Sequence, residues 1–249
     1  MPKRTRPSHT SRSEHWLRSA VNDAPDFLNS KVLEAFGWPA AERIVWRSPI
    51  REDDYAEYYD EAFLERLQLQ DLRTPMRSFW PASGPRWDAL AITDCGKVLL
   101  VEAKAHIDES VDYGSGASPD PYRRIQESLA AAKKAFRASV EASWESPFYQ
   151  YANRLAHLYF LRGLNGIDAY LLFLYFADAP DVPKPCTLDQ WTGAICLTKT
   201  CLGLGAHPYQ KQVKDLVVRV PDILSNTTPN TAAQQAGSAR PPRAGQRDR

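Results

Sequence analysis

The stretch WDALAITDCGKVLLVEAKAH, residues 87–106, contains two apolar runs separated by the turn sequence DCG. Apolar runs of this length, joined by a glycine turn, predict a hairpin of two strands, RWDALAIT and KVLLVEAKA. The second strand ends in Glu102 and Lys104, which are two residues apart and therefore project from the same face. Asp88 stands near the start of the first strand. Pairing about the turn predicts that these three charged side chains converge.

The composition is that of an ordinary globular protein. The chain has 249 residues, of which 43% are apolar and 24% are charged, and its net charge is +1. This length is sufficient for one domain with a sizeable core. The balanced charge argues against a general polycation but leaves room for a local basic patch.

The cysteines and the apolar runs bear on where in the cell the protein is found. None of the four cysteines forms a CxxC pair, which predicts reduced thiols, no zinc site and a cytoplasmic protein. The longest apolar run, residues 169–177, is far shorter than the roughly 20 residues of a membrane-spanning helix. No signal-peptide pattern is apparent, and we expect no membrane partner.

The two ends of the chain differ in composition from its centre. Residues 1–12 are basic and polar, and residues 225–249 are rich in polar residues, Pro and Gly, so both predict disordered tails. The basic tail is either a plain solvated segment or an arm that contacts phosphates. Residues 13–224 are expected to form a single domain.

The elements around the hairpin predict an α/β fold. Apolar periodicity predicts helices over residues 14–21, 24–38, 53–69, 123–140 and 146–166. Strands are predicted within residues 76–87, over 168–178, which should be buried on both faces, and over 216–220. This order predicts a mixed central sheet with helices on its faces.

The charged end of the hairpin has the chemistry of a cation site. Asp88 and Glu102 supply hard carboxylate oxygens, which suit Mg²⁺ or Mn²⁺, and the backbone carbonyl of Ala103 is a further candidate ligand. Lys104 beside them would hold or deprotonate a water and stabilise developing negative charge. The alternative is a salt bridge at a solvated strand end. Because apolar residues precede these charges, we favour a functional site.

Asp88 followed by Glu102-Ala103-Lys104 at the ends of adjacent strands resembles the PD-(D/E)XK nuclease superfamily, which has the restriction-endonuclease-like fold. The resemblance covers residues 53–177 and implies a core of a helix, three strands, a helix and a strand. It implies that Asp88 and Glu102 bind the divalent ion and that Lys104 assists the attacking water, which the ion holds. The chain departs from the family pattern at Trp87, where a proline is usual.

The resemblance also implies a further carboxylate from the first core helix. Within the predicted helix 53–69, Glu57, Glu61 and Glu65 are four residues apart and share one face. Glu57 is the preferred metal ligand and Glu61 the second choice, with Asp60 as another candidate. At least two of the three glutamates are expected to face solvent.

Polar residues on the predicted helix 146–166 are candidates for supporting the site. Gln150 and Arg154 are four residues apart, so both would reach a water or a phosphate; Asn153 and His157 lie at the same helical spacing. A solvent-facing stripe is the competing interpretation. His106 is expected to be structural or exposed. The segment FWPASGPRW, residues 79–87, either stacks on a base or packs as a rigid loop.

Together these features predict a Mg²⁺- or Mn²⁺-dependent nuclease that hydrolyses phosphodiester bonds, with DNA favoured over RNA. A catalytically inactive protein of the same fold, binding nucleic acid or a protein, is the first alternative. An unrelated α/β protein with a salt-bridged hairpin is the second. The sequence makes no prediction of oligomeric state.

Overall fold

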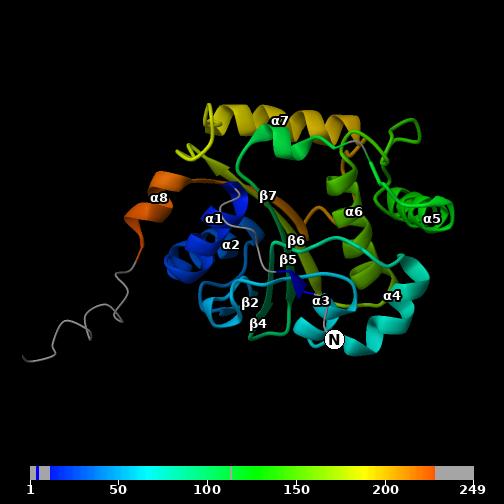
Figure 1. Ribbon diagram of the computed structural model, residues 1–249, viewed down its shortest axis with the longest axis horizontal. Helices are drawn as coiled ribbons and strands as arrows, with labels where there is room; N and C mark the ends of the chain where they lie inside the picture. Colours follow the sequence, from blue (N-terminus) through cyan, green and yellow to red (C-terminus); the bar gives the residue numbers. More distant parts are fainter. Residues whose placement is uncertain (1–3, 6–11, 113, 228–249) are drawn as a thin grey trace, which may run out of the picture.

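The computed structural model describes residues 4–5, 12–112 and 114–227. A five-stranded mixed sheet crosses its centre in the order β2-β4-β5-β6-β7 (Figure 1). The strands are β2 (Ile44–Ser48), β4 (Ala89–Thr93), β5 (Val98–Lys104), β6 (Ala169–Ala177) and β7 (Val213–Arg219). The pairs β2–β4 and β4–β5 are antiparallel, whereas β5–β6 and β6–β7 are parallel. The predicted α/β class with a mixed central sheet is confirmed.

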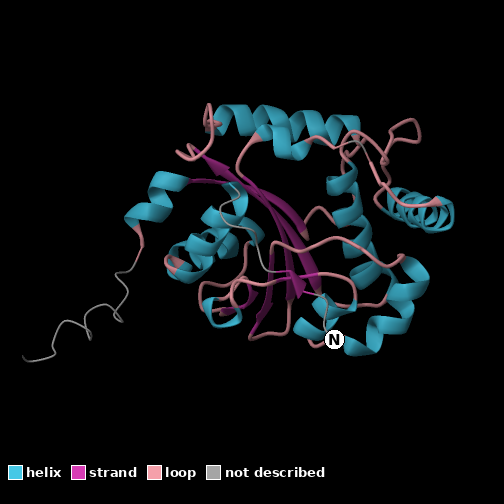
Figure 2. Ribbon diagram, viewed as in Figure 1, coloured by secondary structure: helices cyan, strands magenta, loops and turns pink. Residues whose placement is uncertain are grey.

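Helices cover both faces of the sheet (Figure 2). They are α1 (Arg12–Asn22), α2 (Pro25–Phe36), α3 (Glu61–Arg66), α4 (Arg73–Phe79), α5 (Pro119–Ala135), α6 (Tyr149–Leu158), α7 (Leu188–Cys201) and α8 (Val220–Ser225). A π-helical segment, Tyr159–Leu164, continues α6, and short 3₁₀ turns lie at Arg51–Asp53, Gln70–Leu72 and Ile107–Ser110. One core joins the sheet to α1, α2 and α8, and the other joins it to α3 through α7.

The predicted hairpin is present, and its alternation assigns each side chain to a core. Leu90 and Leu100 pair with each other and face the α3–α7 core, whereas Ala89 and Val101 pair with each other and face the α1–α2 core. Gly96 has a φ of 82° in the turn, and its N–H donates to the carbonyl of Thr93 at 2.9 Å. Glu102 and Lys104 follow Leu100 by two and four residues, so their side chains project from the same face of β5 as that of Leu100. They therefore belong to the α3–α7 face.

The predicted helix over residues 53–69 is wrong. The backbone has positive φ at Asp54, Tyr55 and Asp60, which a right-handed helix excludes. Between these positions β3 (Glu57–Tyr58) pairs with β1 (Arg4–Thr5), and Tyr58 accepts a hydrogen bond from the backbone N–H of Trp87. Pairing with distant segments has overridden the local helical period, and only Glu61–Arg66 is α-helical.

The third strand of the antiparallel part also lies elsewhere than predicted. Residues 76–87 form the end of α4 and a loop, and the edge strand is β2, which the sequence reading did not assign. Helix α7 was not predicted either, because only Trp191 and Thr198 are buried and its apolar periodicity is weak. Strand β6 is confirmed, and all its residues except Tyr170 are buried.

The tail predictions fall mostly on residues 1–3, 6–11 and 228–249, outside the described part of the chain. Of the remainder, Arg4–Thr5 form β1 and Arg12 begins α1. Within the described ranges no helix is both long enough and apolar enough to cross a bilayer.

Candidate active site

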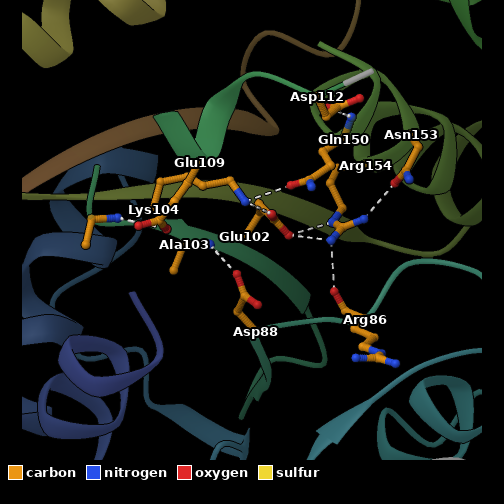
Figure 3. A network of polar contacts seen from close by, with 11 residues as sticks. Arg86, Asp88, Glu102, Ala103, Lys104, Glu109, Asp112, Gln150, Asn153 and Arg154 are labelled. Carbon is orange, nitrogen blue, oxygen red and sulfur yellow. Dashed lines mark hydrogen bonds and ion pairs between the residues drawn. The ribbon is translucent and has the colours of Figure 1, made fainter. Parts of the chain in front are cut away.

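Asp88 lies at the charged end of the hairpin, next to Glu102. The last pair of the hairpin is Ala89 with Val101, and Asp88 is the residue just before β4, so pairing continued by one residue would set it across from Glu102. Residues in such a pair have Cα atoms about 4.5–5.5 Å apart and side chains on the same face. Asp88 Oδ2 accepts a hydrogen bond from the backbone N–H of Ala103 at 2.7 Å (Figure 3). The predicted convergence of Asp88, Glu102 and Lys104 is therefore present.

Glu102 is the centre of a buried ionic network (Figure 3). Its Oε1 accepts from Lys104 Nζ at 2.5 Å. Its Oε2 lies 2.7 Å from Arg154 Nε and 2.5 Å from Arg154 Nη2. The glutamate and arginine side chains are only 4% and 7% exposed. Two cations thus hold both carboxylate oxygens of Glu102.

Helix α6 supplies the supporting residues that its spacing predicted. Gln150 Oε1 accepts from Lys104 Nζ at 2.8 Å. Arg154 donates through Nη1 to Asn153 Oδ1 at 2.7 Å and through Nη2 to the carbonyl of Arg86 at 2.9 Å. Its guanidinium also lies 5.0 Å from the ring centre of Trp87. Four groups therefore fix Arg154, and Asn153 acts by orienting it.

The carboxylates of the site repel one another. Burial, and then the charge of Glu102, raise the pKa of Asp88 well above its usual range. Burial, and then the charges of Glu14 and Glu102, raise the pKa of Glu57 to about 7. Burial alone would raise the pKa of Glu102, but Arg154 and Lys104 lower it below its usual value. Burial and the neighbouring carboxylates therefore favour the protonated forms of Asp88 and Glu57, whereas Glu102 is held in its ionised form.

Lys104 is held in its charged form. Burial lowers the pKa of Lys104, but the carboxylates of Glu102 and Asp88 raise it more, and the net result lies above the ordinary value. The ammonium has three N–H donors, and Glu102 and Gln150 take two of them among the described residues. Lys104 is thus a proton donor and a positive charge in this state.

A cavity of about 20 Å³ adjoins the charged end of β5. Glu102, Lys104, Gln150 and Ser110 line it on one side. The buried Ser110 Oγ has no hydrogen-bond partner within the described part of the chain. Aromatic and aliphatic side chains, among them Phe173, Trp191 and Ile195, form the rest of the lining, and a cavity of this size has room for one water molecule at its polar side chains.

Other predicted residues lie outside this network. Glu61 forms an ion pair with Arg77, and Asp60 Oδ1 accepts from the backbone N–H of Gly84 at 2.7 Å. His106 Nδ1 lies 2.7 Å from Asp108 Oδ1, which is the structural role that was expected. Glu57 does lie at the site, but on β3 rather than on the predicted helix.

Two carboxylates near the site were missed by sequence reasoning. Glu14, in the first turn of α1, acts on Glu57 electrostatically and pairs with Arg18 at 3.3 Å. Glu109 follows β5 and accepts from the backbone N–H of Ala105 at 3.4 Å; burial raises its pKa. Neither has a local sequence signal, because only the packing of α1 and the turn Ile107–Ser110 against β5 brings them near.

The carboxylates of Asp88 and Glu102 are the kind of ligand that a hard divalent ion prefers, but two carboxylates do not complete its coordination shell. Burial and the charge of Glu102 disfavour the ionised form of Asp88, and a divalent ion bound by these two carboxylates would favour it. No group of three or more His, Cys, Asp or Glu in the described ranges is arranged to hold a metal. Mg²⁺ commonly takes one or two carboxylates and completes its shell with water and substrate phosphates. Such an ion would require Arg154 to release Glu102 Oε2.

Comparison of the chain with protein-family models, with curated proteins and with solved structures finds no match.

Proposed function

We propose that the chain is a Mg²⁺- or Mn²⁺-dependent nuclease that hydrolyses phosphodiester bonds, most readily those of DNA. The observation that carries this proposal is the set at the end of the β4–β5 hairpin, where Asp88 accepts from the backbone N–H of Ala103, the residue after Glu102, and Lys104 binds Glu102. Such a set combines two hard anionic ligands with a cation, which is the chemistry that phosphodiester hydrolysis requires.

The strand order supports a restriction-endonuclease-like core. Helices α1 and α2 precede three antiparallel strands, β2, β4 and β5; helices α5 and α6 and the parallel strand β6 follow. This is the order that the resemblance to PD-(D/E)XK nucleases implies. In it, the first core helix is α1, so Glu14 takes the place expected for a helix glutamate, in addition to Glu57.

Each residue then has a role that follows from its contacts. Asp88, Glu102 and the carbonyl of Ala103 would hold the ion, which supplies positive charge to the phosphate and lowers the pKa of the attacking water. Lys104 donates to the phosphate oxygen on which negative charge grows. Gln150 fixes the ammonium at 2.8 Å, and Arg154 offers a second cation once it leaves Glu102.

One observation favours the alternative of an inactive, binding-only protein. Lys104 and Arg154 already neutralise Glu102 without any ion. In that alternative the network is structural, and the protein binds nucleic acid or a protein partner without cutting.

A cleavage assay distinguishes the two functions. Wild type, Lys104→Ala and Glu102→Ala would be incubated with linear, circular and single-stranded DNA and with RNA, in Mg²⁺, in Mn²⁺ and in EDTA. Lys97→Ala is the matched control, since Lys97 also pairs with a buried glutamate, Glu42, at 2.5 Å, but at the opposite end of β5 from Lys104. We expect cleavage by wild type and the control only, and none in EDTA. Binding of nucleic acid without cleavage under all conditions would support the alternative.

A further inference from the structure

A second, much larger cavity lies on the same side of the sheet. It has a volume of about 660 Å³, within the range of roughly 300–1,000 Å³ typical of sites for small ligands. Helices α3 and α4 and the loop after α4 form its walls, Arg124 of α5 lies at its edge, and His157 of α6 lines it. Asp60 holds this loop in place by accepting from the backbone N–H groups of Ser83 and Gly84 at 3.1 and 2.7 Å.

His157 gives the cavity a hydrogen-bond acceptor. The residue is 1% exposed, and its Nδ1 lies 2.8 Å from the backbone carbonyl of Asn153. A carbonyl only accepts, so Nδ1 carries the hydrogen. Burial, and then the charge of Arg154, lower the pKa of His157 to about 3, so the ring is neutral. Its Nε2 therefore carries the lone pair that can accept a hydrogen bond.

The other walls suit a planar aromatic ring. The Trp80 ring centre lies 4.7 Å from that of His157, and Phe63 and Met76 add buried apolar surface. Glu61 and Glu65 also line the cavity, where Glu61 is paired with Arg77 and Glu65 with Arg73. Arg77 and Arg124 line the same cavity; Arg124 is suited to a phosphate beside the ring, and Arg77 becomes so when it leaves Glu61.

The cavity is also joined to the candidate active site through one helix. His157 and Arg154 are three residues apart on α6 and so are neighbours on its surface. Arg154 contacts Glu102, whereas His157 contacts the cavity. A ligand over His157 would thus lie about one helical turn along α6 from the residues that hold Glu102.

We propose that this cavity binds a nucleobase turned out of its stack, belonging to the strand that the Asp88, Glu102 and Lys104 site cleaves. This inference rests on the proposed nuclease function for its substrate. The base lies against the edge of Trp80, which is 4% exposed, and Nε2 of His157 accepts from a ring or exocyclic N–H. Arg124 contacts a flanking phosphate, and Arg77 does so after it leaves Glu61. Adenine and cytosine, which present amino groups, bind better than thymine.

The test measures binding separately from cleavage, on the full chain. Equilibrium dialysis with adenosine, cytidine and thymidine measures whether the cavity binds a nucleobase and which one it prefers. Affinity for a single-stranded oligonucleotide with and without one abasic position, measured in EDTA, tests whether the base belongs to a strand. The blocking variant is Ala82→Trp, because Ala82 is exposed and lines the cavity, and the control is Ala41→Trp at an exposed alanine that does not line it. His157→Phe removes the acceptor, and its thermal unfolding reports whether it is folded.

We expect adenosine and cytidine to bind more tightly than thymidine, with at least a tenfold loss in Ala82→Trp and none in the control. Removing one stacked base should weaken oligonucleotide binding about tenfold, as base–aromatic stacking generally does. No nucleoside binding, or binding that Ala82→Trp leaves unchanged, overturns the inference even when the protein cleaves DNA. Nucleoside binding with no effect of the abasic position assigns the cavity to a free nucleoside or nucleotide instead. Nucleoside binding without cleavage leaves the cavity assignment standing and defeats the nuclease proposal.

Discussion

The ion pair between Arg154 and Glu102 provides the sharpest test of how the site is held together. Replacing Arg154 by Met leaves a similar volume but removes two contacts to Glu102 Oε2, at 2.5 and 2.7 Å. Removing one partner of a buried pair costs about 3–5 kcal/mol, since the other charge remains buried. Lys104 still neutralises part of Glu102, which favours the lower end of this range, about 3 kcal/mol, whereas the lost bonds to Asn153 and Arg86 add about 0.5 kcal/mol each.

We therefore expect Arg154→Met to lower the free energy of unfolding by about 4 kcal/mol at pH 7. For a domain of this size, that corresponds to a fall in Tm of about 8–16 °C. Urea unfolding followed by tryptophan fluorescence measures the change. The double variant Glu102→Gln/Arg154→Met completes the cycle, and a coupling energy of about 2–3 kcal/mol is expected between the two positions.

A surface pair is the matched control. Arg162 lies 2.6 Å from Asp168, and these side chains are 26% and 49% exposed, so Arg162→Met should cost about 1 kcal/mol or less. A loss below 1 kcal/mol in Arg154→Met, with coupling near zero, would show that the network around Glu102 is not the buried ionic centre described above.

Three further predictions follow from the electrostatics of the site. Lys104→Ala should lower phosphodiester cleavage by about 10²–10⁴-fold, as loss of an acid–base or charge-stabilising group generally does, and Lys97→Ala should cleave at the wild-type rate in the same single-turnover assay. The pKa of Glu57 is raised from 4.5 to about 7, so folding favours its protonated form, and ionised Glu57 lowers the stability of the folded state increasingly as pH rises from about 4.5 to about 7. In EDTA, Glu57→Gln should therefore gain up to about 3 kcal/mol of stability relative to wild type over that pH range. Urea melts at several pH values measure this difference, and parallel pH profiles of the two proteins would refute it. Mn²⁺ at 100 times its Kd should raise the free energy of unfolding of the wild type by about 3 kcal/mol. Asp88→Asn keeps the side-chain shape but loses the anionic ligand, so Mn²⁺ should stabilise this variant much less. Differential scanning calorimetry measures both changes.

The local sequence pattern around the hairpin was enough to predict several residues of the site. Period-two alternation assigns Glu102 and Lys104 to one face, and the turn at Gly96 sets a register that places Asp88 next to Glu102. Four-residue spacing on a helix likewise predicted that Gln150 and Arg154 point the same way, and both contact the network. These features depend on neighbours within about 20 residues or within one element, which is why sequence periodicity captures them.

The segment around Glu57 shows where that reasoning stops. Its charges and apolar residues recur at helical spacing, yet Glu57 lies on β3, because this segment pairs with β1 and with the backbone of Trp87. Glu57 was preferred to Glu61 as a metal ligand on a predicted helix that in the structure begins only at Glu61, and the charge of Glu102 acts on Glu57 from outside that element. Glu14 lies near the site on a helix more than 80 residues before Glu102 along the chain, and no local sequence pattern predicts this proximity.

By itself, the sequence determined the α/β class, the hairpin, the buried strand β6 and the shared face of Glu102 and Lys104, because alternation and helical period are local consequences of backbone geometry. Only the tertiary structure decided that Arg154 neutralises Glu102, that Glu14 and Glu57 add their charge, and that a cavity opens over His157. Those facts depend on which distant segments pack together, and packing is fixed by burial and pairing across the whole chain rather than by the residues at any one position.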